Sequence, residues 1–512
     1  MTLETIENNK RVAKNSLFLF FRMLITLVVS LYTSRVVLAN LGIIDYGINN
    51  VVAGLVTMFT FATSSLAGGT QRFLTFAIGE KNFNKLQLIF STAFFVHLII
   101  AILVGLLILL VGYWFLTNKL NIPSNRMDAA QWIFFCSIVT IVLNIVQVPY
   151  MSCIIAHENM GVYAYMSIYE ALAKLLIAFC LIISSIDRLK IYSLLMMLSQ
   201  ASSILFYCLY SIHKYPECQV RMIVDKKLLK SMIHYSGWDI IGCTGVMLNT
   251  QGINILLNMF FGPVVNAARA ISVQVNGLAL QLIWNFQMAV NPQIVKYYAA
   301  GQKEQMIRLI YNNARFAGLL ILVIMIPLFF EIDFVLRLWL EKVPKDTTFF
   351  VKVILVQTFI QTMTRPIVKG LHATGEMRLF NLLSGGILLI IVPISWLLLK
   401  LKISLYLVLI IALIPWMIEP IIDLLLLRKY IGIGISFYYK YVYVNVFLIA
   451  IFSSVLPLLF YYQLDEGWIR FILVSLTSIL GVVVLTYYFG LSKTVRQIVN
   501  EKIIRFITII KK

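Results

Sequence analysis

The residues of this sequence that could do chemistry are charged side chains inside long apolar runs. They are Arg22, Arg72, Lys174, Arg269, Arg315, Lys352 and Arg365 among the bases, and Glu170, Asp239, Glu419 and Asp423 among the acids. A charge at the centre of a bilayer costs at least about 2.5 kcal/mol, so such residues normally face a bundle interior or a water-filled cavity. The alternative, for bases near the end of a run, is that the long side chain extends to the interface.

Several of these charges share a face with other polar side chains when the runs are drawn as helices of about 100° per residue. The face residues are Arg22 in the first run, Asn50 and Arg72 in the second, Arg269, Asn276 and Gln281 in the eighth, and Arg365 in the tenth. Small and hydroxylated residues on such faces can serve close helix packing. The arginines beside them favour a hydrated cationic cavity between two helix bundles.

The acids allow a coupling site for a cation. Glu170 and Lys174 stand in the favourable i, i+4 order for an ion pair, which is either structural or part of the cavity lining. Glu419 and Asp423 are one turn apart, and like charges that close favour a protonated or cation-bound state. Their position near the cytoplasmic end of a run is the alternative explanation. Asp239 is the most isolated acid and our first choice for the coupling cation.

Composition supports a membrane location for these charges. The chain has 512 residues, of which 61% are hydrophobic and 12% charged, and its mean hydropathy is +0.90. Too few charges remain to cover a water-facing surface, which excludes a soluble enzyme. The net charge of +20 indicates basic cytoplasmic loops and anionic phospholipids better than nucleic acid.

The six cysteines predict neither a disulfide framework nor a metal site. All but Cys218 lie in apolar runs, and no CxxC pair occurs. We expect no histidine to join them as a metal ligand, so they are typical of small buried hydrophobic residues.

Hydropathy predicts an all-α polytopic membrane protein with about 14 transmembrane helices. The spans are expected near 16–38, 46–78, 86–116, 129–151, 160–184, 191–212, 231–260, 263–295, 307–330, 349–370, 379–399, 403–427, 441–462 and 468–490. The second and eighth are polar enough for a strict hydropathy threshold to miss them. With both termini cytoplasmic, the inside segments hold 24 basic residues and the outside segments 11, as the positive-inside rule requires.

An internal repeat relates the first six spans to the next six. Equivalent pairs, 217 to 220 residues apart, are Pro149 with Pro366, Ala156 with Ala373, Met160 with Met377 and Gly42 with Gly262. We therefore expect two six-helix bundles related as parallel repeats, followed by two extra helices. The predicted limits are 1–212, a linker at 213–230, 231–430, and 431–512 with a basic tail. Two such bundles without an ATP-binding motif indicate alternating access.

The sequence resembles bacterial Wzx-type polysaccharide-biosynthesis exporters of the MOP (multidrug/oligosaccharidyl-lipid/polysaccharide) superfamily. The residues that carry this resemblance are Asn15, Ser16 and Leu17 entering span one, Leu41, Gly42, Tyr46 and Gly47 before span two, Arg72 near its end, and Gly79 and Phe83 after it. The motifs cover the first eighty residues or so, and the topology covers the whole chain.

The resemblance implies a flippase for undecaprenyl-pyrophosphate-linked oligosaccharides in the bacterial inner membrane. Related lipid II flippases carry arginines at places corresponding to Arg22, Arg72 and Arg269, and a cation site that includes an acid on span seven. This makes Asp239 a candidate, with Asn381 as a weaker partner. The implied coupling ion is Na+ or H+, with no other cofactor. The expected partners are the lipid-linked glycan, anionic phospholipids and polysaccharide polymerase or chain-length proteins, and the expected state is monomeric.

Two other functions remain open at this stage. A MATE-like multidrug exporter would need an anionic or aromatic cavity, whereas bases outnumber acids inside the spans. A membrane glycosyltransferase, polymerase or ligase would need a sizeable extracytoplasmic loop with acid and base residues, and the predicted outside segments are short. We therefore expect a transporter and not an enzyme.

Overall fold

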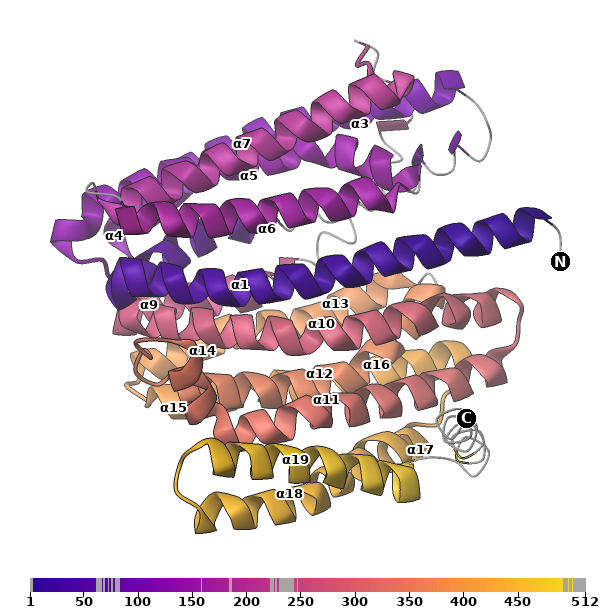
Figure 1. Cartoon of the computed structure of the whole chain (residues 1–512). Coiled ribbons are helices and arrows are strands. Elements are labelled where there is room, and N and C mark those ends of the chain that lie inside the picture. Colours follow the sequence, from indigo (N-terminus) through magenta and orange to yellow (C-terminus); the bar gives the residue numbers. More distant parts are fainter. Residues whose placement is uncertain are drawn as a thin grey trace, which may run out of the picture. The chain divides into compact units, whose positions relative to one another are not determined.

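The computed structural model of the chain describes residues 3–60, 83–157, 159–183, 187–221, 247–374 and 376–490, with single residues and pairs of residues between and after them. These residues form helices joined by short turns, and none of them is in a strand (Figure 1). The helices are α1 (Leu3–Thr57), α3 (Phe83–Leu107), α4 (Tyr113–Asn118), α5 (Met127–Ala156), α6 (Met160–Ile183), α7 (Arg188–Lys214), α9 (Ile253–Phe261), α10 (Pro263–Ala299), α11 (Lys303–Trp339), α12 (Thr347–Thr374), α13 (Met377–Leu389), α14 (Ile391–Lys400), α15 (Leu405–Ile411), α16 (Ile414–Ile431), α17 (Ile435–Tyr438), α18 (Asn445–Gln463) and α19 (Trp468–Leu485).

Short 3₁₀ and π-helical segments continue or connect these helices. The 3₁₀ turns are η1 (Met58–Thr60), η3 (Ser124–Arg126) and η4 (Pro216–Cys218), and the π-helical segments are η2 (Ile108–Gly112), η5 (Leu248–Gly252), η6 (Tyr439–Val444) and η7 (Thr486–Gly490). A π turn widens a helix without ending it. The third predicted span therefore runs unbroken through α3, η2 and α4.

The predicted polytopic all-helical fold is confirmed. Within the described ranges, ten helices are long and apolar enough to cross a membrane. The eighth and tenth predicted spans correspond to α10 and α12, which are long helices with polar residues along them and are not among the ten. The prediction that a strict hydropathy threshold would miss the eighth span is therefore confirmed, and such a threshold also misses the tenth.

The backbone makes the same turn at equivalent positions in the two halves of the repeat. Gly42 divides α1 into two helical segments with φ 76° and ψ 169°, and Gly262 separates α9 from α10 with φ 78° and ψ −174°. A positive φ of this kind favours glycine because it has no Cβ. Pro149 lies inside α5 and Pro366 inside α12, each in the helix's second half. Equivalent residues thus occupy equivalent structural positions.

The described contacts divide the chain into two compact units. The first comprises Met1–Ala270, Trp339–Lys345 and Leu388–Ile403, and the second comprises Ile271–Leu338, Asp346–Ile387 and Ser404–Lys512. The core of the first unit joins α1, α5, α6, α7 and α9 through buried apolar side chains such as Ile48, Val51, Phe134, Leu181 and Ile255. The limits predicted from the order of the spans remain predictions.

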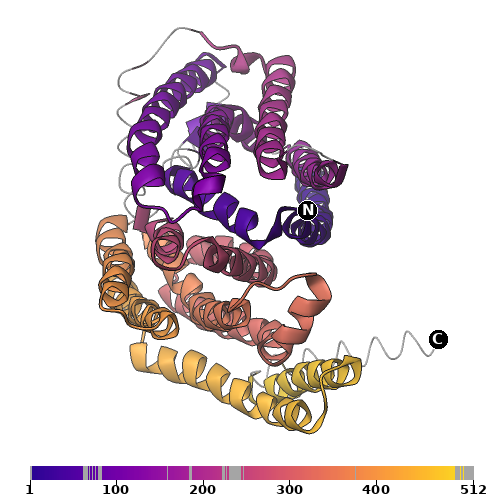
Figure 2. The ribbon, with the colours of Figure 1, turned by 90° about the vertical axis from the view of Figure 1, so that its left-hand side faces the viewer.

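The second unit has its own core. Its buried side chains come from α10, α11, α12 and α16 and from the C-terminal helices, and they include Ile294, Ile310, Ile367, Leu424 and Val446. Helices α18 and α19, yellow in Figures 1 and 2, pack against each other. They correspond to the two extra spans that follow the repeat.

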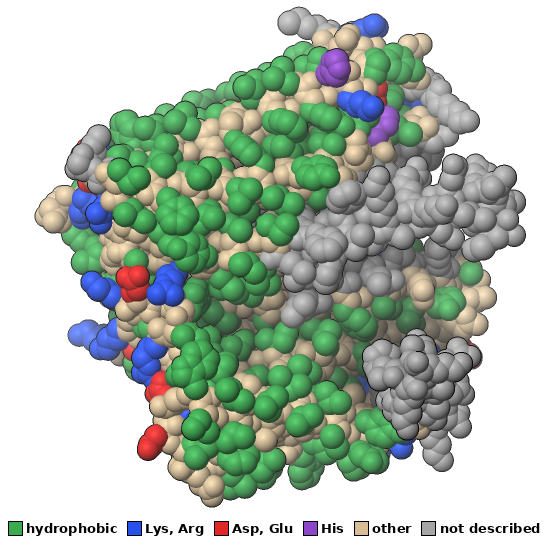
Figure 3. All heavy atoms as spheres, viewed as in Figure 1, with side chains coloured by type: hydrophobic (Ala, Val, Ile, Leu, Met, Phe, Trp, Pro, Cys, Tyr) green, Lys and Arg blue, Asp and Glu red, His purple; other side chains and the backbone are tan. Residues whose placement is uncertain are grey.

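Apolar side chains also cover the outer surface of the helices. Ile183 is 87% exposed and Leu110 73%, which would be costly in water. On the face drawn in Figure 3, hydrophobic side chains follow the helices along their length and charged side chains gather at the helix ends. This surface fits a protein that crosses the membrane many times.

Candidate functional site

The predicted site residues are distributed over both units. Arg72 and Asp239 lie outside the described residues, and Arg22 lies within α1 but its side chain is outside them. Asn50, Lys174 and Arg269 belong to the first unit, whereas Asn276, Gln281, Arg365, Asn381, Glu419 and Asp423 belong to the second. Each unit therefore has its own polar cluster.

In the first unit, asparagines form a buried amide network. The Nδ2 atom of Asn254 on α9 donates to Oδ1 of Asn50 at 2.9 Å, and Asn266 Nδ2 on α10 donates to Oδ1 of Asn254 at 2.7 Å. Asn258 Nδ2 donates to Asn266 Oδ1 at 3.0 Å. Amides that are buried must be paired in this way. Asn50, predicted to bind substrate, is thus hydrogen-bonded within the protein.

Arg269 lies on α10 beside this network and is half-buried. Its guanidinium donates to the carbonyl oxygen of Thr250 at 3.2 Å. Thr250 is in the π-helical segment η5, where carbonyl groups are displaced from regular helix pairing. The widened turn of span seven thus holds a charged side chain of span eight.

Glu170 and Lys174, predicted as an ion pair, are not in close contact with each other. Glu170 is half-buried on α6, and Lys174, one turn later, is exposed. The two charges interact electrostatically. Neither residue forms one of the close ion pairs found among the described residues.

The second unit brings three of the predicted charged residues together. Asp423 on α16 is fully buried, and Glu419, one turn earlier, is half-buried. The charge of Glu419 interacts with those of Asp423 and of Arg365 on α12. The Arg365 guanidinium lies 5.3 Å from the centre of the Trp284 ring on α10, a cation–π contact that helps to hold it inside the unit.

Asp423 is only partly satisfied. One of its carboxylate oxygens accepts a hydrogen bond from the Ser384 hydroxyl on α13. The other, Oδ2, is buried without a partner among the described residues. Asn381, also buried, precedes Ser384 by one turn on α13. A buried carboxylate in this state is costly unless it takes up a proton or a small cation.

The remaining amides predicted to bind substrate differ in their environment. Oδ1 of Asn276 accepts a hydrogen bond from Thr358 on α12, whereas Gln281 is half-buried on α10. Arg315 on α11, which could have extended to an interface, is instead 5% exposed. Its guanidinium lies 4.0 Å from the centre of the Tyr441 ring.

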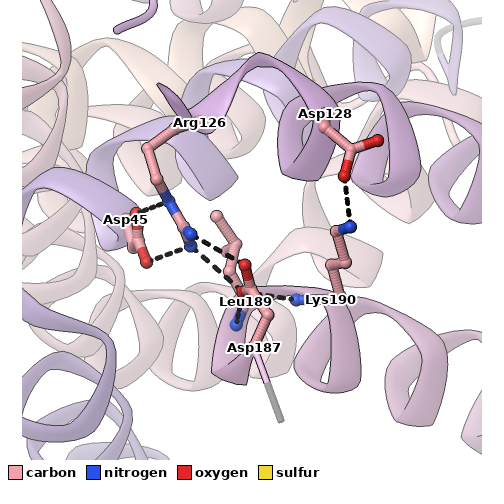
Figure 4. A network of polar contacts seen from close by, with 6 residues as sticks. All are labelled: Asp45, Arg126, Asp128, Asp187, Leu189 and Lys190. Carbon is pink, nitrogen blue, oxygen red and sulfur yellow. Dashed lines mark hydrogen bonds and ion pairs between the residues drawn. The ribbon is translucent and has the colours of Figure 1, made fainter. Parts of the chain in front are cut away.

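An ion network that the sequence did not predict links α1, η3 and α7 in the first unit (Figure 4). Arg126 bonds Asp45 at 2.5 Å and Asp187 at 2.7 Å. Asp187 also caps α7 by accepting from the amide of Leu189 at 3.0 Å, and Asp128 pairs with Lys190 beside it. Partial burial opposes ionisation of Asp187, but the Arg126 and amide hydrogen bonds outweigh it, so the pKa of Asp187 is lowered.

The sequence also missed a cluster at the end of α5. His157 Nε2 lies 2.5 Å from Oε1 of Glu217, and Cys153 Sγ lies 3.9 Å from the same oxygen. Hydrogen bonds to Cys153 and Glu217 raise the pKa of His157 to about 9. Contrary to the expectation from the sequence, a histidine lies near a cysteine, because His157 follows Cys153 by one helical turn and both lie beside Glu217.

Comparison with solved structures identifies the fold. A lipid II flippase, MurJ, in an inward closed conformation matches with a TM-score of 0.69 and 12% identity, over 93% of this chain and 98% of that chain. A MATE family multidrug resistance transporter of the MOP superfamily matches in its inward-facing conformation with a TM-score of 0.63 and 13% identity, over 82% and 96%. A MATE family multidrug resistance transporter in an outward-facing conformation matches with a TM-score of 0.55 and 14% identity, over 84% of this chain and 96% of that chain. No family model and no curated protein matches the sequence.

The chain therefore has the fold of the MOP-superfamily transporters. It is a multi-pass membrane protein whose structural neighbours are exporters and a lipid flippase.

Proposed function

We propose that this protein is a flippase that carries an undecaprenyl-pyrophosphate-linked oligosaccharide across the bacterial cytoplasmic membrane by alternating access. The observation that carries the proposal is the presence of arginines inside the spans of a transporter fold, with Arg269 and Arg365 half-buried on the polar helices α10 and α12. Such residues are expensive to insert and mark an anionic substrate pathway.

The chemistry of pyrophosphate suits these residues. A guanidinium presents a planar fork that bonds two phosphate oxygens at once. In this proposal Arg22, Arg72 and Arg269 hold the pyrophosphate, and Arg365 and Lys174 add positive charge. The lipid tail stays in the bilayer.

The glycan would exchange hydrogen bonds with amide side chains. Gln281 suits this task better than Asn50, because the Asn50 Oδ1 atom already accepts from Asn254. Asn276 is intermediate, since its Oδ1 accepts from Thr358. The glycan is a repeat unit of O-antigen, capsule or exopolysaccharide.

The acidic cluster of the second unit is proposed to couple transport to an ion. Asp423 with its unpartnered Oδ2 atom, and Glu419 beside it, would take up H+ or Na+. Asn381 and Asp239 are proposed as additional cation ligands. Arg365 interacts with Glu419 electrostatically. Binding of the ion at Glu419 would therefore change the attraction of Arg365 for the anionic substrate.

The folds of the solved neighbours cover this chain to different extents. The lipid II flippase matches 93% of the chain, and the MATE transporters match 82% and 84%. The protein is proposed to lie in the inner membrane with both termini cytoplasmic, as a monomer, among anionic phospholipids and next to polymerase and chain-length proteins.

The test is flipping of a fluorescent undecaprenyl-pyrophosphate glycan in proteoliposomes. We expect Arg269→Ala or Arg22→Ala to stop flipping while the protein still inserts, and Arg269→Lys to be intermediate because charge remains without the fork. The control is Arg337→Ala, which removes an arginine that pairs with Glu466 at an exposed helix end. Full flipping by both alanine variants would contradict the proposal.

A MATE-like exporter of cationic molecules is the second candidate. The pair of carboxylates, Glu419 half-buried and Asp423 fully buried, favours it, since negative charge suits a cationic substrate. Efflux of a fluorescent cationic dye by the same proteoliposomes, inhibited by Asp423→Asn, would support this function. Flipping of the glycan without dye efflux would exclude it.

A further inference from the structure

We propose that Cys153, His157, Glu217 and Cys218 form a zinc site that fastens the segment after α7 to the end of α5. The first three residues offer a thiol, an imidazole and a carboxylate whose ligand atoms all lie within 4.8 Å of one another. Cys218 Sγ lies 3.4 Å from Cys153 Sγ, but it is not part of the group whose ligand atoms all lie within 4.8 Å of one another, so as the fourth ligand it would have to move toward the other two. The proposal is independent of the transport function.

The donor set selects the metal. Thiolate, imidazole and carboxylate groups are each ligands that Zn²⁺ takes in tetrahedral sites, whereas Mg²⁺ and Ca²⁺ take oxygen ligands. Two thiolates bound to one zinc ion lie about 3.8 Å apart, close to the 3.4 Å between these sulfur atoms. To admit the ion, His157 and Glu217, now 2.5 Å apart, need to separate by about 1 Å, and Cys218 needs to approach them.

Local structure supplies each ligand. Cys153 lies in the last turn of α5 and His157 directly follows that helix, so one helical turn separates them. Glu217 and Cys218 are consecutive in the 3₁₀ turn η4. Cys153 and Cys218 are fully buried, which protects thiolate ligands from solvent.

Neighbouring side chains hold this arrangement. The Tyr215 ring stacks on the His157 ring, with centroids 4.3 Å apart and planes 12° apart. The Tyr215 hydroxyl accepts from Asn159 at 3.4 Å. Outer contacts that orient a metal-binding histidine are a normal part of zinc sites.

The site would fix the start of the connection between the two halves of the repeat. The backbone beyond Cys218 is also tied to α3: Gln87 donates to the Gln219 carbonyl at 3.4 Å and the Arg221 amide donates to Ser91 at 3.1 Å. A bound zinc ion would add a stronger link at one point. Since this segment belongs to the linker predicted at 213–230, the ion would hold the first residues of that linker against the end of α5.

The test uses the full-length protein, purified in detergent under reducing conditions without a metal-binding tag. We expect about one zinc ion per chain by elemental analysis. After chelation, Co²⁺ should give the thiolate-to-cobalt charge-transfer band and the intense visible bands of a tetrahedral site. No bound zinc together with no cobalt bands would overturn the proposal, and this measurement needs no variant.

Variants identify the ligands. We expect Cys153→Ser and His157→Ala to weaken zinc binding at least about 100-fold, and Cys218→Ser to remove part of the charge-transfer band. The matched control is Cys136→Ser, another buried cysteine on α5. Equal zinc binding by Cys153→Ser and the control would place the metal elsewhere. A Cys153–Cys218 disulfide in protein taken directly from cells, found by thiol counting, would also contradict the proposal.

Discussion

Gly47 lies so close to Pro263 that a Cβ atom on the glycine would be 1.8 Å from the proline carbonyl oxygen. The two residues follow the equivalent turns at Gly42 and Gly262, so the internal repeat brings its two matching turns into backbone contact within the first unit. Only glycine permits this approach.

We therefore expect Gly47→Ala to destabilise the protein by about 3 kcal/mol, the upper end of the usual range for overpacking, or to prevent folding, because a backbone carbonyl cannot move aside as a flexible side chain can. The measurement is thermal unfolding of the detergent-purified protein, followed by size-exclusion chromatography. Gly386→Ala is the control, since a Cβ at this helical glycine meets nothing within 4 Å. A thermal midpoint of Gly47→Ala equal to that of the control would disprove the close contact.

The Arg126 network should make stability depend on pH. Because the pKa of Asp187 is lowered in the folded protein, its ionised form contributes stability above the ordinary value of 3.8. That contribution is lost as the pH falls further, through the folded-state pKa. We expect Asp187→Asn to cost about 1.5–3 kcal/mol at pH 7 and the difference from the unsubstituted protein to close below pH 3.8.

The comparison for this prediction is Asp128→Asn, whose carboxylate is 81% exposed beside Lys190. An exposed pair contributes less than about 1 kcal/mol. Thermal unfolding of both variants across the pH range separates the two cases. A loss in Asp187→Asn that stayed constant down to acidic pH would exclude an electrostatic origin.

The sequence predicted the fold well because local patterns determine it. Apolar runs of sufficient length gave spans whose limits agree with the helices to within a few residues in cases such as α6, expected at 160–184 and observed at Met160–Ile183. The spacing of Gly42 and Gly262 predicted equivalent turns, and both glycines have positive φ.

The polar clusters were less predictable because their partners are distant in sequence. Arg126 is 81 residues from Asp45, and Glu217 is 60 residues from His157, so no local pattern connects them. The spacing of Cys153 and His157 by one helical turn was the available signal, but it points to a site only once η4 is known to pack beside it. The pairing of Asp423 with Ser384 likewise depends on how α13 packs against α16.

The acidic cluster leads to a prediction about ion coupling. We expect Asp423→Asn to reduce the flipping rate at least about tenfold and to abolish its response to an imposed H+ or Na+ gradient, because a neutral amide cannot exchange a proton or balance a cation. Flipping in proteoliposomes with and without each gradient is the measurement. Glu466→Gln, an exposed acid paired with Arg337, should keep the full response. If Asp423→Asn kept its response to the gradient, the coupling site would not be on α16.

The asparagine network provides a way to separate structural residues from substrate ligands. Asn266 is fully buried and bonds both Asn254 and Asn258, so Asn266→Leu should leave several buried groups unpaired and cost at least about 3 kcal/mol. Asn50 accepts from Asn254 at the edge of the same network. We expect Asn50→Ala to lower the thermal midpoint by less than Asn266→Leu does, and to leave the flipping rate per folded molecule unchanged.

Asn118→Leu is the matched control for both, because Asn118 is exposed and its side chain bonds Trp114 and Thr117 of its own helix. Unfolding midpoints and flipping rates, the latter normalised to folded protein, are measured on the same preparations. If Asn50→Ala lowered the flipping rate while its thermal midpoint stayed that of the control, Asn50 would be a substrate ligand whose bond to Asn254 opens during transport. A lowered thermal midpoint with an unchanged flipping rate would instead show that the network holds the second segment of α1 against α9 and α10. Gln281 would then be the better amide for glycan binding.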